Sequence, residues 1–113
     1  MRYHLVTLGC AKNVADSDGI GALLAQAGMT RADQVDDTNI LIVNTCGFLQ
    51  ASRRESLDAL RALGEHKRAD QFLIAVGCLI SRYGETIRRE VPLVDAVFDS
   101  GQWLALPRLI DHL

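Results

Sequence analysis

Four short apolar runs alternate along the chain with longer segments in which apolar residues recur every three or four positions. The apolar runs span residues 3–8, 40–43, 72–76 and 96–98. Continuous apolar runs of this length, rich in β-branched and large aliphatic residues, are typical of strands buried on both faces of a parallel sheet. A further short strand is expected near residues 29–31.

The segments between these runs predict helices. One helix is expected around residues 14–27, with Gly28 as its C-terminal cap. A second is expected around residues 57–63, and Gly64 is expected to break or end it.

Two more helices are expected in the last third of the chain. The first of them contains an apolar stripe over residues 80–91 and is expected to stop at Pro92. The second spans residues 103–113, where Pro107 marks either a kink or the true start of the helix.

The order of elements predicts an α/β protein. Parallel strands need crossover connections, which are right-handed almost without exception. We therefore expect a three-layer, doubly wound sandwich with a mostly parallel sheet of four to five strands, in the flavodoxin-like order 2-1-3-4-5.

Composition narrows the class of protein. A length of 113 residues fits one domain, and 49% hydrophobic residues can build its core. The formal net charge of −2 disfavours strong electrostatic binding of nucleic acid, so no direct contact with it is expected. No apolar run approaches the roughly 20 residues of a membrane span. The N-terminus has no signal-peptide pattern, which predicts a cytoplasmic protein.

Cysteine occurs three times, each time at the end of an expected strand and beside a glycine. The three are Cys10, Cys46 and Cys78, and the neighbouring glycines are Gly9, Gly47 and Gly77. In a parallel sheet the carboxyl ends of all strands lie on one edge, where ligands of open α/β folds bind. Three cysteines that are more than thirty residues apart in sequence are thereby expected to converge in space.

This setting suits metal-bound thiolates. Each cysteine precedes an expected helix, and a helix N-terminus favours negative charge. Lys12 adds a nearby positive charge. Cysteine thiolate is the usual protein ligand of iron–sulfur clusters, and three ligands would leave one iron open for chemistry.

Two other interpretations of the cysteines remain open. A cysteine at a strand end is often a small buried hydrophobic residue. A zinc site needs a fourth ligand, such as histidine. His4, His66 and His112 are all expected away from the edge that carries the cysteines, as surface or packing residues.

Polar residues near the cysteines have ordinary structural roles as well. Helix capping explains Asn13, Asp16 and Ser17. Asn44 and Thr45 are expected to brace the loop of Cys46 through bonds to the backbone. Residues that could instead lie beside a cluster or face a substrate are Gly9, Lys12, Asn13, Asp16, Asn44, Thr45, Gly47 and Gly77.

Three motifs together resemble a known enzyme family. Residues 8–13, followed by 16–18, are similar to the opening signature of the radical-SAM methylthiotransferases. Residues 42–48 and 76–79 are similar to their second and third signatures. The resemblance spans residues 3–98, nearly the whole chain.

Within this family the motifs are more similar to the ribosomal-protein branch. That branch adds a methylthio group to the β-carbon of an aspartate in a small-subunit ribosomal protein. Ala11 stands where this branch often has proline, and Asp18 where glutamate is common. The alternative is the sister branch, which modifies an adenosine of transfer RNA.

The resemblance implies a division of labour. Residues 1–113 would be a single N-terminal domain that binds an auxiliary 4Fe-4S cluster through Cys10, Cys46 and Cys78. The open iron would hold the sulfur to be donated. A separate radical-SAM domain would hold a second 4Fe-4S cluster in a CxxxCxxC motif and cleave S-adenosylmethionine. A C-terminal domain would help to bind the substrate.

The sequence contains no CxxxCxxC motif, so both downstream domains are expected to be absent from this chain. Its partners would be the radical-SAM domain of the same polypeptide and the ribosomal protein. The chain alone is expected to be inactive. A different functional class also remains, namely an α/β binding or redox module that carries no cluster.

Overall fold

In a computed structural model of the chain, the described residues are 2–8, 11–45, 50–77, 85–99 and 108. The side chains of residues 11–13, 37, 50–52 and 99 are outside this description.

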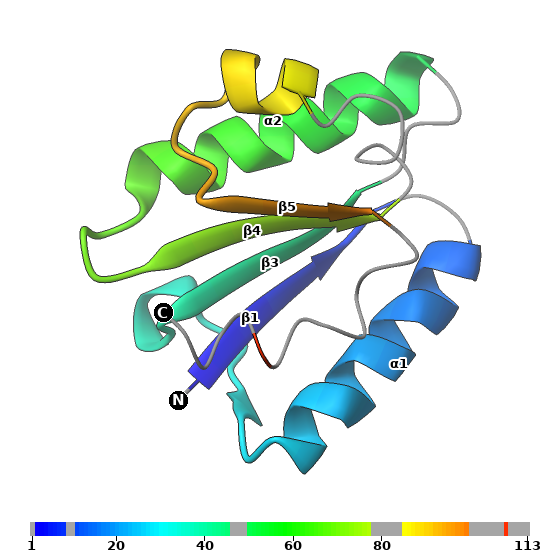
Figure 1. The fold of residues 1–113 in the computed structure, drawn as a ribbon, viewed down its shortest axis with the longest axis vertical. Helices are drawn as coiled ribbons and strands as arrows, with labels where there is room; N and C mark the ends of the chain where they lie inside the picture. The colour runs from blue at the N-terminus through cyan, green and yellow to red at the C-terminus, as the bar shows by residue number, and fades with distance from the viewer. Residues whose placement is uncertain (1, 9–10, 46–49, 78–84, 100–107, 109–113) are drawn as a thin grey trace.

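Within these described ranges, five strands form one sheet in which every neighbouring pair is parallel. The order is β2-β1-β3-β4-β5, which confirms the expected flavodoxin-like arrangement (Figure 1). The strands are β1 (Arg2–Thr7), β2 (Thr30–Arg31), β3 (Ile40–Thr45), β4 (Phe72–Gly77) and β5 (Ala96–Asp99). Each differs from its predicted range by a few residues at most.

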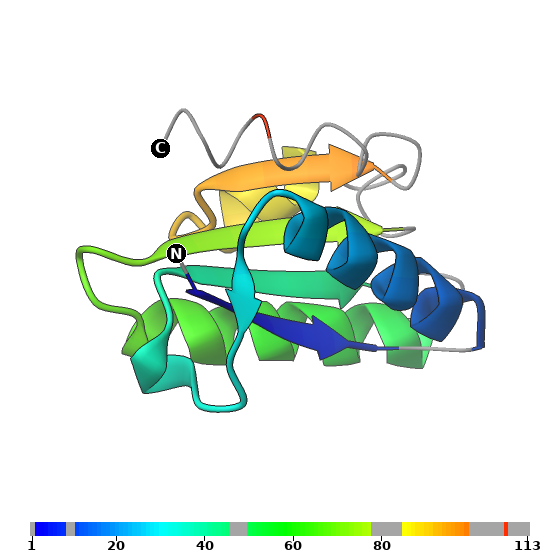
Figure 2. The same cartoon turned by 90° about the horizontal axis from the view of Figure 1, so that it is seen from below.

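Helices cover both faces of the sheet, as the doubly wound prediction requires. Helix α1 (Ala11–Gln26) lies on one face, and α2 (Gln50–His66) lies on the other together with a helical segment at residues 85–90 (Figures 1 and 2). A short 3-10 helix, η1 (Val35–Asp37), precedes β3. None of the helices in the described ranges is long and apolar enough to cross a lipid bilayer.

Alternation along β3 explains how one strand serves two cores. All six of its residues are buried. Ile40 and Ile42 pack in the cluster that includes Leu24 of α1, on one face of the sheet. Leu41 and Val43 pack in the cluster that includes Leu60 of α2, on the other face. Successive side chains of a strand point to opposite faces, so a strand covered on both faces must be apolar throughout.

The end of α1 confirms the predicted cap. Gly28 has φ of 86°, a left-handed conformation that costs other residues energy. The amide of Met29 donates to the carbonyl of Leu24 at 3.0 Å, and the amide of Gly28 donates to that of Ala25 at 3.1 Å. These two bonds form a Schellman motif and satisfy the last carbonyls of the helix.

The prediction that Gly64 breaks or ends the second helix is wrong, because α2 continues to His66. A Cβ atom at Gly64 would lie 3.1 Å from the Cβ of Leu93, closer than side chains usually pack. The glycine therefore allows the helix to approach the segment before β5. Packing, and not helix termination, explains this residue.

The last two predicted helices fall only partly within the described residues. Residues 85–90 are helical and end ahead of Pro92, as expected, while residues 80–84 lie outside the description. Of the helix expected at 103–113, only Arg108 is described, and it is helical.

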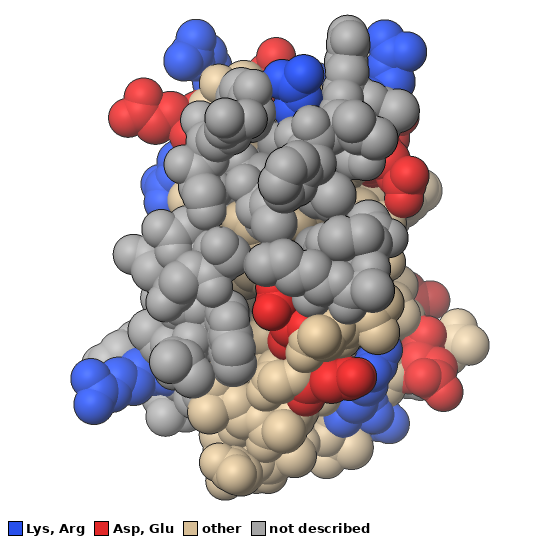
Figure 3. All heavy atoms as spheres, turned by 90° about the vertical axis from the view of Figure 1, so that its right-hand side faces the viewer, with Lys and Arg blue, Asp and Glu red and all other residues tan. Residues whose placement is uncertain are grey.

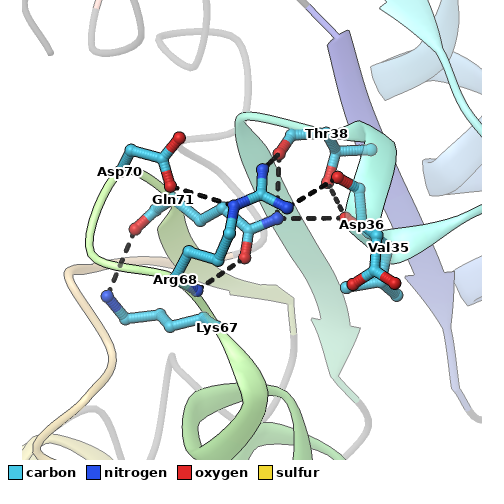
Figure 4. A network of polar contacts seen from close by, with 7 residues as sticks. All are labelled: Val35, Asp36, Thr38, Lys67, Arg68, Asp70 and Gln71. Carbon is cyan, nitrogen blue, oxygen red and sulfur yellow. Dashed lines mark hydrogen bonds and ion pairs between the residues drawn. The ribbon is translucent and has the colours of Figure 1, made fainter.

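The amino ends of β3 and β4 are joined by a polar network around the buried Gln71, which we call the amino-edge network (Figure 4). Gln71, only 2% exposed, donates to the carbonyls of Val35 and Thr38 at 3.0 and 2.9 Å and accepts from the amide of Arg68 at 2.8 Å. The guanidinium of Arg68 donates to the carbonyl of Asp36 at 2.7 Å. The Thr38 hydroxyl donates to the carbonyl of Val35, also at 2.7 Å.

Candidate functional site

The carboxyl edge of the sheet holds the residues that the sequence singled out. There β1 ends at Thr7, β3 at Thr45 and β4 at Gly77, on neighbouring strands. Helices α1 and α2 both begin at this edge (Figure 1). The three cysteines follow these strand ends in sequence but lie outside the described residues, so their role as ligands stays a prediction.

The strand ends are in register across the edge. Thr7 is the partner of Asn44, and Thr45 is the partner of Gly77. The amide of Leu8, just beyond β1, donates to the carbonyl of Asn44 at 3.0 Å. The chain therefore leaves the three strands from adjacent positions.

Side chains on the α1 face of this edge form a buried polar contact. The hydroxyls of Thr7 and Ser17 are 2.6 Å apart, and the Asn44 amide nitrogen donates to the Ser17 oxygen at 3.0 Å. Ser17 is 7% exposed and Asn44 1%. Buried polar groups need such partners, because an unpaired one costs about 1–3 kcal/mol. We call these three residues the carboxyl-edge triad.

Gly77 is cradled by the neighbouring strand. Its φ is 108°, in the region that favours glycine. A Cβ atom there would lie 2.6 Å from the carbonyl oxygen of Thr45 and 2.7 Å from Oδ1 of Asn44. Any side chain at this position would collide with β3, so the residue before Cys78 is fixed as glycine by both conformation and space.

Asn44 and Thr45 are both buried and hydrogen-bonded, but the loop of Cys46 that they are predicted to brace lies outside the described residues, so that role stays a prediction. The described bonds lead to neighbouring elements: Asn44 bonds Ser17 of α1, and the Thr45 hydroxyl donates to the carbonyl of Val76 in β4 at 2.7 Å. They thus connect β3 to α1 and to β4.

The capping interpretation of the first helix is wrong for Ser17 and Asp16. Because α1 begins at Ala11, both residues lie inside the helix. Asp16 is half-buried, and Ser17 faces the sheet. Lys12 and Asn13 are in the first turn of α1, with side chains outside the description, and Gly9 and Gly47 lie outside it altogether.

Sequence reasoning left Ser17 and Thr7 out of the candidate site. The sequence did contain a signal for Ser17, because this serine lies on the same buried face of α1 as Ile20 and Leu24. A serine on a buried helix face needs a hydrogen-bond partner. What the sequence lacked was the identity of that partner.

The two histidines in the described part of the chain, His4 and His66, do not converge on this edge. His4 Nδ1 lies 3.0 Å from the carbonyl oxygen of Ala32, which is a packing role. His66 is the last residue of α2, at the opposite end of the helix from the carboxyl edge, and His112 is outside the described residues. Within the described ranges, no three or more His, Cys, Asp or Glu residues group as metal ligands.

Figure 3 views the carboxyl edge face on. Described acidic and basic side chains both border it, and neither sign of charge dominates the visible rim. This mixture agrees with the net charge of −2.

Comparison with known proteins places the chain in a family. The model of "Uncharacterized protein family UPF0004" matches residues 2–99. The chain is 37% identical over 110 residues to the ribosomal protein uS12 methylthiotransferase RimO of Herpetosiphon aurantiacus, covering 97% of the chain and 24% of that relative. It is 39% identical over 113 residues to the protein of the same name from Chloroflexus aurantiacus, covering 100% and 25%.

The chain thus spans about a quarter of the length of the curated relatives it matches. The family match covers β1 to β5 and with them the strand ends that form the carboxyl edge. The chain belongs to the protein family UPF0004, and it matches the N-terminal quarter of proteins named as methylthiotransferases of ribosomal protein uS12.

Proposed function

We propose that this chain is the sulfur-donor domain of a methylthiotransferase, in which Cys10, Cys46 and Cys78 hold an auxiliary 4Fe-4S cluster. The observation that carries the proposal is the adjacency of the three strands that precede these cysteines. β1, β3 and β4 are neighbours in the sheet, and their carboxyl ends share one edge.

The spacing of the strand ends supports a shared ligand set. Cys46 and Cys78 each come one residue after a register pair, Thr45 and Gly77. Neighbouring strands lie about 4.8 Å apart, so the chain enters the second and third cysteines from positions that are close together. Cys10 comes two residues after Leu8, whose amide is bonded to the same end of β3.

The donor atoms of this chain fit a 4Fe-4S cluster. Three thiols are the donor type that iron–sulfur clusters use. Gly77, which has no room for a side chain, brings the backbone of β4 close to β3 immediately before Cys78. When bound, the cluster would supply an open iron at which sulfur is held before transfer.

The rest of the activity is assigned to a part of the polypeptide beyond this chain. The curated relatives are about four times as long, since the chain covers 24–25% of them. The sequence has no CxxxCxxC motif, so radical generation, a second 4Fe-4S cluster and S-adenosylmethionine binding would belong to a radical-SAM domain outside it.

The proposed substrate is an aspartate of ribosomal protein uS12. The support is that relatives 37–39% identical to this chain carry ribosomal protein uS12 in their names. This favours the ribosomal-protein branch over modification of transfer RNA. The aspartate follows from the resemblance of the motifs. A substrate that is part of the ribosome also implies a cytoplasmic location.

The test is the iron and acid-labile sulfide content of the chain after anaerobic reconstitution. We expect about four iron and four sulfide per chain, with brown colour. The matched control is the triple variant Cys10→Ser, Cys46→Ser, Cys78→Ser, which should hold none. Equal iron in the two proteins, or none in either, would overturn the proposal.

Single substitutions sharpen the result. Each of the three single Cys→Ser variants should lower cluster occupancy, because the two thiolate ligands that remain would bind a 4Fe-4S cluster only weakly. Full iron and sulfide in Cys78→Ser would show that the third cysteine is not a ligand.

A further inference from the structure

We infer that Asn44 is a positioning residue that ties together the three strand ends from which the cysteines emerge. The inference rests on the proposed function, because it gives the buried side chain a purpose in cluster binding. The Asn44 amide nitrogen bonds Ser17 of α1, whose hydroxyl in turn contacts Thr7 of β1. The Asn44 amide oxygen lies against Gly77 of β4.

The contact towards β1 passes through Ser17. The Asn44 nitrogen donates to the Ser17 oxygen at 3.0 Å, and that oxygen lies 2.6 Å from the hydroxyl of Thr7. Thr7 is the last residue of β1, and Ser17 stands on the first half of α1. The carboxyl-edge triad therefore fixes the two elements that flank Cys10 in sequence, the strand before it and the helix after it.

The contact towards β4 is steric. Asn44 Oδ1 lies 2.7 Å from the position that a Cβ atom would occupy on Gly77. The amide thus rests against the backbone one residue before Cys78. Asn44 itself is two residues before Cys46. A single side chain accordingly sets the relative position of all three segments.

Asn44 is a buried polar residue at a position where an apolar one would also fit the core pattern. It lies on the same face of β3 as Ile40 and Ile42, both 0% exposed. An aliphatic residue would continue that core without any need for hydrogen-bond partners. A buried amide is stabilising only when it is bonded, so it specifies one arrangement of its neighbours.

The test uses two variants of the triad, each with a matched control at the amino edge. Asn44→Ala removes the buried amide, and Gln71→Ala removes another buried amide from the opposite edge. Thr7→Val removes one hydroxyl, and Thr38→Val removes a bonded hydroxyl from the opposite edge. Thr7→Ser keeps the hydroxyl and is the rescue.

Each variant is reconstituted anaerobically, reduced, and compared by its EPR spectrum and by the rate at which EDTA strips its iron. Loss of a residue that orients metal ligands typically weakens metal binding by about 10–100-fold. We expect Asn44→Ala to lose iron roughly ten-fold faster and to show a broadened EPR signal. Thr7→Val should change in the same direction, and Thr7→Ser should restore wild-type behaviour.

The controls distinguish positioning from simple stability. Gln71→Ala and Thr38→Val should lower the urea midpoint yet keep the wild-type EPR signal and iron-loss rate. If the triad variants do the same, the side chains are structural only and the inference is overturned. Should Asn44→Ala fail to fold, the Thr7→Val and Thr7→Ser pair decides the question.

Failure of the two proposals is distinguishable. A wild-type chain that holds no cluster overturns the proposed function and this inference with it. A wild-type chain with a full cluster, together with triad variants that hold it unchanged, overturns the inference alone.

Discussion

The two edges of this sheet use polar side chains in different ways. At the amino edge, the amide nitrogen of Gln71 and the guanidinium of Arg68 donate to backbone carbonyls of residues 35–38. At the carboxyl edge, the described bonds of the triad join side chains from three separate elements. The amino-edge network holds the segment 35–38 against the start of β4, while the carboxyl-edge triad holds β1, β3 and α1 together.

This difference between the two edges predicts where substitutions should affect only folding stability and where they should also affect cluster binding. Backbone carbonyls are present whatever the sequence, so the amino-edge network depends only on its donors. The triad depends on the identity of every member. A change at the amino edge should therefore cost folding free energy, and one at the carboxyl edge should also alter the geometry of the segments that follow.

The largest effect is expected from Gly77→Ala at the carboxyl edge. The new methyl group would meet the Thr45 carbonyl at 2.6 Å, and φ of 108° is itself strained for alanine. Strain and overpacking each cost about 1–3 kcal/mol, so we expect a loss of about 3 kcal/mol in the free energy of unfolding. Urea denaturation measures this loss. A loss below about 1 kcal/mol would show that β3 shifts to accommodate the methyl group at little cost.

A smaller loss is expected from Gln71→Ala at the amino edge. Removing this amide takes one donor each from the carbonyls of Val35 and Thr38, which keep bonds from Thr38 and Arg68, and it leaves the backbone amide of Arg68 without its side-chain acceptor. The cost of unpaired buried groups is about 1–3 kcal/mol, and we expect about 2 kcal/mol by urea denaturation. An unchanged midpoint would mean that water replaces the side chain without penalty.

Gly28→Ala separates conformational strain from collision. Gly28 shares the positive φ of Gly77 but has nothing within 4 Å of an added Cβ. The left-handed conformation alone costs about 1–2 kcal/mol. We expect about 1 kcal/mol, and less for Gly28→Asn, measured as a shift in thermal midpoint. If Gly28→Ala lost as much stability as Gly77→Ala, the collision of a Cβ atom at Gly77 with β3 would contribute nothing to the cost of that substitution.

The smallest effect is expected at the surface of α2. Arg61 lies 3.3 Å from Glu90 of the helical segment at 85–90, with side chains 46% and 44% exposed. Exposed ion pairs contribute about 0–1 kcal/mol and are screened by salt. Arg61→Gln should cost less than about 0.5 kcal/mol, and the difference should vanish at 1 M salt.

The sequence predicted the sheet well for a physical reason. Strands buried on both faces are apolar at every position, and the central run at 40–43 is entirely buried in the structure. The alternation of strands and helices along the chain then allowed only a few sheet topologies, because the crossover connections between parallel strands are right-handed. The end of α1 was also predictable, since the cap at Gly28 depends on local conformation alone.

What the sequence could not predict depends on contacts between distant residues. Gly64 looked like a helix end because its partner Leu93 is 29 positions away in sequence and its proximity was unknown. Ser17 looked like a cap because capping and core pairing use the same residue type. The three cysteines stand after the strand ends as expected, and their shared role stays a prediction.

Gly64 has one more consequence, for local opening of the native state. Glycine weakens a helix interior by about 1 kcal/mol relative to alanine, so the last turn of α2 has little stability of its own. It is held by the close approach to Leu93 in the segment that leads into β5. Amide hydrogen exchange at residues 64–66 would thus report the docking of that segment, even while the rest of α2 remains protected.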